Sequence, residues 1–214
     1  MPNLVELQLR ASLDTFGIGD FPDDTSLPFL RVLTLEGFKS SDLISLLTEI
    51  DMPVLSSLNI SITEASESSE LNDVVESPIL SLRLRHIISF SVESEYGSEV
   101  FGGLPTFLKL MPGLHYLKIS YLGGPWSNIA AALRKDTPDL REVEITDCSI
   151  TSNALVSTIR GLFCHYTTRP LLDHIAIRRC QAVSQEVVPV LQKWTKTVVW
   201  EPCKWTESQY DVFV

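Results

Sequence analysis

The sequence has 214 residues, of which 44% are apolar and 21% are charged. Such a chain can bury a sizeable core, so an intrinsically disordered class is excluded. Its 17 Lys and Arg against 27 Asp and Glu give a net charge of −10, which argues against nucleic acids and anionic membranes as partners because both attract a positively charged surface.

Neither export nor a cofactor is indicated. The first residues lack the basic region and apolar block of a signal peptide, and no apolar run approaches the roughly 18 residues of a membrane span. The 4 cysteines form no C-x-x-C pair, which favours buried thiols over a disulfide framework or a zinc site. We therefore expect an intracellular protein, cytoplasmic or nuclear, without a metal or a cofactor.

One pattern, P-x-L-x-x-L-x-L, recurs along the chain in near-constant steps. The first copy runs from Pro2 to Leu9, and a copy without proline has Ile87, Phe90 and Val92 in its apolar positions. Recurrence at a fixed period indicates a repeat architecture, here one repeat domain over residues 1–214. The copies begin near residues 2, 28, 53, 85, 112, 138 and 170.

Each x-L-x-L-x segment predicts a short strand, since alternation sends its apolar residues to one side. One such strand cannot bury its apolar side alone, whereas stacked copies can. The expected fold class is therefore α/β: a solenoid, or horseshoe, with about seven parallel inner strands and outer helices.

Apolar residues at helical spacing predict helices between the strands, and the two longest repeat steps predict insertions near residues 61–78 and 161–169. The first insertion is expected to lead into a short helix. Pro189 should kink the last long helix or shift its start. The predicted helices are Ser41–Ile50, Pro125–Lys135, Ser152–Phe163 and Ser184–Trp194.

Residues 194–214 are expected to form an irregular C-terminal cap, to which Thr197–Trp200 could add an eighth strand. Lysines and tryptophans alternate in this segment, as in patches that stack nucleic-acid bases. Bulky aromatic residues that seal the last coil would give the same pattern, and the net charge of −10 favours that cap.

An acidic stretch is the strongest asymmetry of charge. Residues 40–82 hold eight acids and no Lys or Arg, and five of the acids, from Glu64 to Glu76, are spaced three apart. This stretch could steer a basic partner, or it could be a solvated outer face that keeps the protein soluble.

The polar positions of the strands should form the inner face. Its middle is small and hydroxylic, whereas its C-terminal end carries larger side chains of the kind that anchor protein partners. Mixed polar residues on an ordinary exposed sheet face are the alternative. The candidate partner-binding residues are Tyr116, Lys118, Glu142, Glu144, His174 and Arg178, and their predicted inner-face neighbours are Ser120, Thr146 and Ala176.

With Cys148 and Cys180 each three residues after a strand isoleucine, the chain resembles the leucine-rich repeat family, whose motif L-x-x-L-x-L is followed by Asn or Cys. The other repeats depart from that last position. The resemblance implies that both cysteines are buried thiols bonded to the turn backbone, although a disulfide or metal pair would also suit two such neighbouring residues. Cys164 and Cys203 fit no pattern.

The repeats and the serine-rich insertions between them are similar to the ribonuclease-inhibitor-like class and to the repeat regions of fungal F-box proteins. In that family an F-box docks on a ubiquitin-ligase adaptor and the repeats present a substrate. No F-box-like segment is found here. A missing N-terminal segment or a partner is expected to cover the first repeat, because repeat arrays normally shield their terminal coils.

The histidines and glycines match no catalytic or phosphate-binding motif. We therefore expect a non-enzymatic protein–protein interaction scaffold, the substrate-binding repeat region of an F-box receptor. The alternative is a free-standing leucine-rich repeat regulator or inhibitor that binds a basic protein.

Overall fold

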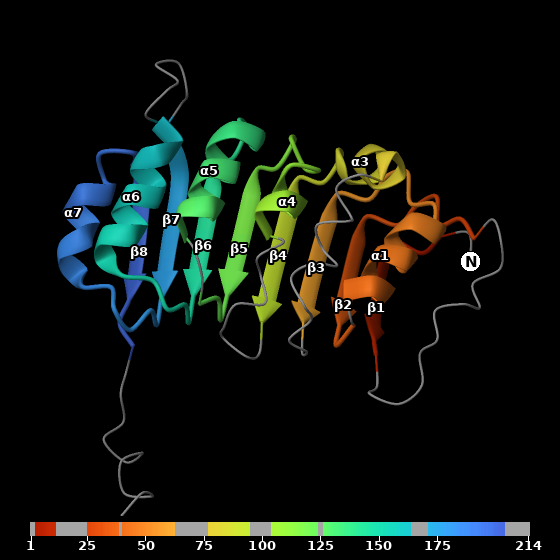
Figure 1. Cartoon of the computed structure of the whole chain (residues 1–214), viewed down its shortest axis with the longest axis horizontal. Coiled ribbons are helices and arrows are strands. Elements are labelled where there is room, and N and C mark those ends of the chain that lie inside the picture. Colours follow the sequence, from red (N-terminus) through yellow and green to blue (C-terminus); the bar gives the residue numbers. More distant parts are fainter. Residues whose placement is uncertain are drawn as a thin grey trace, which may run out of the picture.

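Eight short strands form one open, fully parallel sheet in a computed structural model that describes residues 3–11, 25–38, 40–62, 77–94, 104–123, 126–163 and 171–203. The order of the strands in the sheet is their order in the sequence, so each described strand pairs with its sequence neighbours (Figure 1). The strands are β1 (Glu6–Arg10), β2 (Val32–Glu36), β3 (Ser57–Ile62), β4 (Ser89–Ser94), β5 (Tyr116–Ser120), β6 (Glu142–Thr146), β7 (Leu172–Arg178) and β8 (Thr195–Glu201).

The repeat pattern sets the register of the sheet. The first strand leucine of each copy lies opposite its counterpart in the next copy, as Leu7 does with Leu33 and Leu33 with Leu58. The same column continues through Phe90, Leu117, Val143, Ile175 and Val198. The predicted parallel pairing and its alternation are therefore confirmed, and the eighth strand is regular and longer than expected.

Helices connect most of the strands and cover one face of the sheet (Figure 1). The helix over Ser152–Phe163 is confirmed as predicted, and those near residues 41–50 and 125–135 are shifted by one residue. The helical elements are α1 (Ser40–Glu49), α3 (Pro78–Leu84), α4 (Leu104–Leu108), α5 (Trp126–Asp136), α6 (Ser152–Phe163), the 3₁₀ turn η4 (Gln185–Val187) and α7 (Val188–Leu191).

The last predicted helix, Ser184–Trp194, is wrong as one continuous element. The chain makes the 3₁₀ turn η4 and then the short helix α7, whose second residue is Pro189. Proline fits there because it has a fixed φ and needs no hydrogen-bond partner for a backbone N–H. The predicted cap is also wrong for residues 195–201, which form β8; residues 204–214 lie outside the described part of the chain.

The strand leucines and the inner sides of the helices share one apolar core. Its buried residues, from Leu30 to Leu191, form one contiguous cluster. Leu33 and Leu35 of β2 are fully buried, whereas Leu7 and Leu9 of β1 are only partly buried. β1 has one neighbouring strand among the described elements, which explains the difference.

A left-handed residue follows four of the strands. Gly37, Tyr121, Asp147 and Arg179 have φ values of 74°, 57°, 53° and 53°. The N–H of each donates to a carbonyl of the next strand, as in the bond from Asp147 to Arg178 at 2.9 Å, and the positive φ turns the chain that follows away from the strand. The turn thus continues the ladder of the sheet beyond the strand ends. None of the described helices is long and apolar enough to cross a membrane.

We predict that Leu117→Ala will lower the free energy of unfolding by about 2–5 kcal/mol, because the substitution leaves a cavity in the core. Leu117 is fully buried in the middle of the column. Denaturant unfolding would measure the change. The matched control is Leu82→Ala on α3, where the leucine is 58% exposed and the cost should be within about 0.5 kcal/mol. Equal costs at the two positions would contradict this packing.

Candidate functional site

The six candidate residues lie together on the sheet face that points away from the helices, here called the open face. They alternate with the buried residues of β5, β6 and β7. Pairing across the strands places them in rows: Tyr116 lies beside Glu142, which lies beside His174 on the next strand, Lys118 lies beside Glu144, and Arg178 lies beside Thr146. The predicted grouping of Tyr116, Lys118, Glu142, Glu144, His174 and Arg178 on one surface is therefore what the structure has.

Glu144 is the centre of this group. Its Oε2 accepts a hydrogen bond from the Tyr116 hydroxyl at 3.3 Å. Its Oε1 lies 3.4 Å from the Lys118 Nζ and 3.6 Å from the Arg178 Nε, and accepts a bond from the Thr146 hydroxyl at 3.3 Å. The side chain of Glu144 is only 18% exposed. Its carboxylate therefore interacts mainly with these neighbours and is little accessible to a partner.

The group extends to the last strand. Arg178 also pairs with Glu201 of β8 through its Nη1. Lys118, Glu144, Arg178 and Glu201 therefore form a row of alternating sign across four neighbouring strands, here called the charge ladder. Sequence analysis missed Glu201 because residues 194–214 were expected to be irregular, which hid the register that puts Glu201 opposite Arg178.

Tyr116 is held in its protonated form. Burial raises its pKa to about 12, and the charge of Glu144 and the hydrogen bond to it contribute in the same direction. The phenol therefore stays a hydrogen-bond donor at physiological pH. It orients Glu144 and does not act as a base.

Glu142 and His174 are the candidate residues most available to a partner. Glu142 is exposed and has no ion pair among the described residues, and His174 beside it is half-buried. Lys118 and Arg178 remain about a third exposed despite their pairing. A partner would thus meet these four side chains, of which Lys118 and Arg178 are held in place by Glu144.

Three predicted inner-face neighbours do not contribute to this surface. Ser120, Thr146 and Ala176 are buried, with 4%, 5% and 0% exposure. They are small, and the longer side chains next to them in the sheet, such as Glu144 beside Ala176, cover them.

In the N-terminal half of the open face, the side chains are joined mainly by hydrogen bonds from amide groups. Gln8 donates to Glu36 at 2.7 Å, and the Asn59 amide donates to the Thr34 hydroxyl at 3.1 Å. Arg10 lies 3.9 Å from Glu36, but its side chain is 83% exposed, so this pair contributes little.

A second row, at the strand ends, was missed by the sequence analysis. Arg179 binds Asp147 through three hydrogen bonds of 2.6 to 3.1 Å, and Tyr121 occupies the same position in the preceding repeat. The charge of Asp147 raises the pKa of Tyr121. The signal available was that Tyr, Asp and Arg each follow a strand in successive repeats.

The cysteines behave as buried thiols in the turns. The Cys148 Sγ accepts a bond from the Leu122 N–H at 3.3 Å and lies 3.3 Å from the Thr146 carbonyl. Cys180 makes the equivalent contact with the Arg178 carbonyl at 3.5 Å. Burial raises the pKa of both thiols, that of Cys148 to about 12. The expected bonding to the turn backbone is confirmed, and the alternative disulfide is wrong because both thiols are free.

Cys203 is a correction to the sequence analysis, which found no pattern for it. It follows Glu201 by two residues, as Cys180 follows Arg178, and Glu201 pairs with Arg178. It therefore occupies the same turn position in the eighth repeat. Cys164 lies outside the described residues.

Charge is distributed unevenly between the described elements and the rest of the chain. The described residues include 14 acids and 14 Lys or Arg, so the whole net charge of −10 belongs to the other segments. The acids from Glu64 to Glu76, which sequence analysis expected to form an acidic ridge, are among those outside the described residues.

Comparisons with models of known protein families and with curated protein sequences find no match for this chain.

We predict that Glu144→Gln will lower the pKa of Tyr116 from about 12 toward its ordinary value of 10.0, because both the negative charge and its hydrogen bond raise that pKa. Ultraviolet absorbance of the phenolate would follow the titration, with Tyr116→Phe identifying the signal. A raised pKa stabilises the folded chain below pH 10, and that stabilisation is lost as the pH rises through about 12. The variant should therefore lose less stability across this range. An unchanged titration would show that Glu144 has no influence on Tyr116.

We also predict that Glu144→Lys will destabilise the protein by about 1–3 kcal/mol, because it breaks charged hydrogen bonds and adds a third cation between Lys118 and Arg178. Glu142→Lys is the matched control on the same strand. It changes an exposed side chain and should alter the free energy of unfolding by about 0.5 kcal/mol or less. Denaturant unfolding compares the two, and equal losses would mean that Glu144 is not the centre of the group.

Proposed function

We propose that this chain is a non-enzymatic scaffold for protein–protein interaction, built as a leucine-rich repeat solenoid. The regular spacing of the P-x-L-x-x-L-x-L copies supports the repeat assignment, as does the order of the eight parallel strands. Free thiols that bond to the turn backbone at Cys148 and Cys180 are a further trait of such repeats.

The open face is the observation that carries the proposal. All six of its candidate side chains carry polar groups and stand on a rigid sheet, and the charge ladder fixes Lys118 and Arg178 before any partner arrives. Fixed side chains lose little conformational entropy on binding, which is the usual gain from preorganisation. Tyr116 and the arginine belong to the residue types that are enriched at protein interfaces.

The proposal places this scaffold in an F-box ubiquitin-ligase receptor as its substrate-binding repeat region. Support comes from the resemblance of the repeats and their serine-rich insertions to fungal F-box proteins. Adaptor binding would belong to an F-box, and these residues would present the substrate. The open face would then select the substrate by its charge pattern, positive toward Glu142 and negative toward Lys118.

A second candidate function is a regulator or inhibitor that binds a basic protein. The observation that favours it is the excess of acids outside the described elements, where 13 of the 27 acids stand with only 3 of the 17 Lys and Arg. Segments of one charge increase the rate of encounter with a partner of opposite charge. Stoichiometric capture of one basic protein would favour this function over the receptor.

Affinity capture with the tagged chain and with its complete gene product tests both functions. We expect ubiquitin-ligase subunits with the complete product only, and a substrate with both. Glu142→Lys should weaken substrate binding at least tenfold, whereas Glu6→Lys, the same change in the same row at the far end of the open face, should leave it unchanged. Equal binding by the two variants would remove the C-terminal open face from the proposal, and the absence of ligase subunits from the complete product would overturn the receptor.

A further inference from the structure

Exposed apolar side chains gather at one edge of the molecule. Five of the eight large apolar residues that are exposed in the described chain stand just before a strand, at what is here called the strand-start edge. Two more, Ile79 and Leu82, lie on α3. The five are Val5, Phe29, Val54, Ile88 and Leu171.

The exposed residues of α3 are not needed for its packing. Leu80 and Leu84 anchor the helix in the core with no exposed surface, whereas Ile79 and Leu82 are 49% and 58% exposed. Residues three apart share a face of a helix, so these two form one apolar strip turned toward solvent. Apolar surface of this kind, gathered beside polar groups, is typical of an interaction site.

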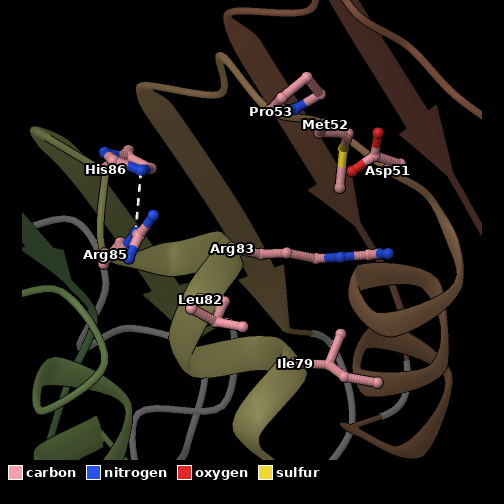
Figure 2. A pocket seen from close by; sticks show the side chains of 8 residues that line it. All are labelled: Asp51, Met52, Pro53, Ile79, Leu82, Arg83, Arg85 and His86. Atoms are coloured by element: carbon pink, nitrogen blue, oxygen red, sulfur yellow. Dashed lines mark hydrogen bonds between the residues drawn. The ribbon is translucent and has the colours of Figure 1, made fainter.

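A pocket of about 320 Å³ lies beside this strip. Figure 2 shows Ile79 and Leu82 on α3 and, across from them, the segment Asp51–Pro53 that follows α1. Arg83 extends from α3 toward α1, and Arg85 and His86 stand at the other side. We call this the α3 pocket; the fold builds it from two elements that are more than 25 residues apart in the sequence.

Arg83 fixes the base of the α3 pocket. Its Nη1 donates to the Leu47 carbonyl at 3.1 Å and to the Ile50 carbonyl, which closes the C-terminal end of α1. A cation suits this position because the end of a helix carries partial negative charge. Its other N–H groups make no further hydrogen bond among the described residues, so they remain able to bind an acceptor.

Among the described residues that line the α3 pocket, positively charged groups predominate. Two guanidinium groups and an imidazole line it, and Asp51 is the carboxylate among them, which accepts a hydrogen bond from the Ser26 hydroxyl at 3.3 Å. Arg85 is exposed and donates through Nε to the His86 Nε2 at 2.9 Å. This bond positions the guanidinium and leaves its two terminal nitrogens, which can bind a carboxylate.

We propose that the α3 pocket binds a linear peptide segment of a protein partner in which an apolar side chain stands next to a carboxylate. The apolar side chain packs against Leu82, Ile79 and Pro53, and the carboxylate pairs with Arg85. This inference rests on the proposed scaffold function and adds a second binding surface, at the strand-start edge, with an acidic segment as its ligand.

The test is selection of random 12-residue peptides displayed on phage against the immobilised full chain. We expect enrichment of peptides that pair Leu, Ile or Phe with Asp or Glu. The most enriched sequence, synthesised with a fluorescent label, should bind with a Kd that rises at least tenfold in Leu82→Asn and in Arg85→Glu. Both positions are exposed, so circular dichroism should show unchanged melting.

Matched controls separate the α3 pocket from the rest of the strand-start edge. Leu171→Asn and Arg141→Glu change an exposed leucine and an exposed arginine elsewhere on that edge, and both should keep the Kd within twofold. The inference is overturned by failure to enrich any peptide, by enrichment of Lys- and Arg-rich peptides, or by a Kd that neither pocket variant changes. Loss of peptide binding in Glu142→Lys alone would support the open face and the proposed function while overturning the α3 pocket.

Discussion

The alignment of apolar columns across the sheet is the constraint on which the rest of the structure depends. A single strand of five to seven residues offers two or three apolar side chains, and burial of each contributes about 1.5–3 kcal/mol, most of which the loss of chain entropy offsets. Only stacking makes the sum favourable, because Leu33, Leu58 and their counterparts shield one another. Most repeats begin with a proline, and several strands end in a left-handed turn. Both features help to fix the register, because the chain then enters and leaves the sheet at the same position of each repeat.

One side of each strand packs into the core, so the residues on the other side can vary without disturbing that packing. Packing does not decide the side chains of the open face, and there Glu144 gathers Tyr116, Lys118 and Arg178 around one carboxylate. A half-buried acid with two cations and two hydroxyl donors is well satisfied, so this group rigidifies the surface. The residues left for recognition are those at its border, Glu142 and His174, together with the exposed parts of the two cations.

Sequence analysis could predict the strands and their register because both follow from a local period of two repeated seven times. It predicted α6 to the residue, since twelve residues at helical spacing with a serine at the start leave little choice. It missed α4, which has five residues and too few turns to show a period. Sequence analysis could not predict three other features: the bonds of Glu144, the role of Glu201 and the α3 pocket. Each depends on which side chains from different repeats come into contact. Arg83, for example, donates to the carbonyl of Ile50 at the end of α1, which is 33 residues earlier in the sequence. No local sequence pattern predicts such a contact.

The net charge of the chain says less about its partners than the sequence suggested. All 13 acids outside the described elements belong to segments that follow the end of a strand, namely residues 12–24, 63–76, 95–103 and 204–214. Among the described residues, the α3 pocket is lined by Arg83 and Arg85 on one side of the charge balance and by Asp51 on the other. Interactions between exposed charges are screened beyond about 8 Å at physiological salt, so the groups next to a ligand matter more than the net charge of the whole chain. A net negative charge therefore does not exclude an acidic segment as the ligand of this pocket.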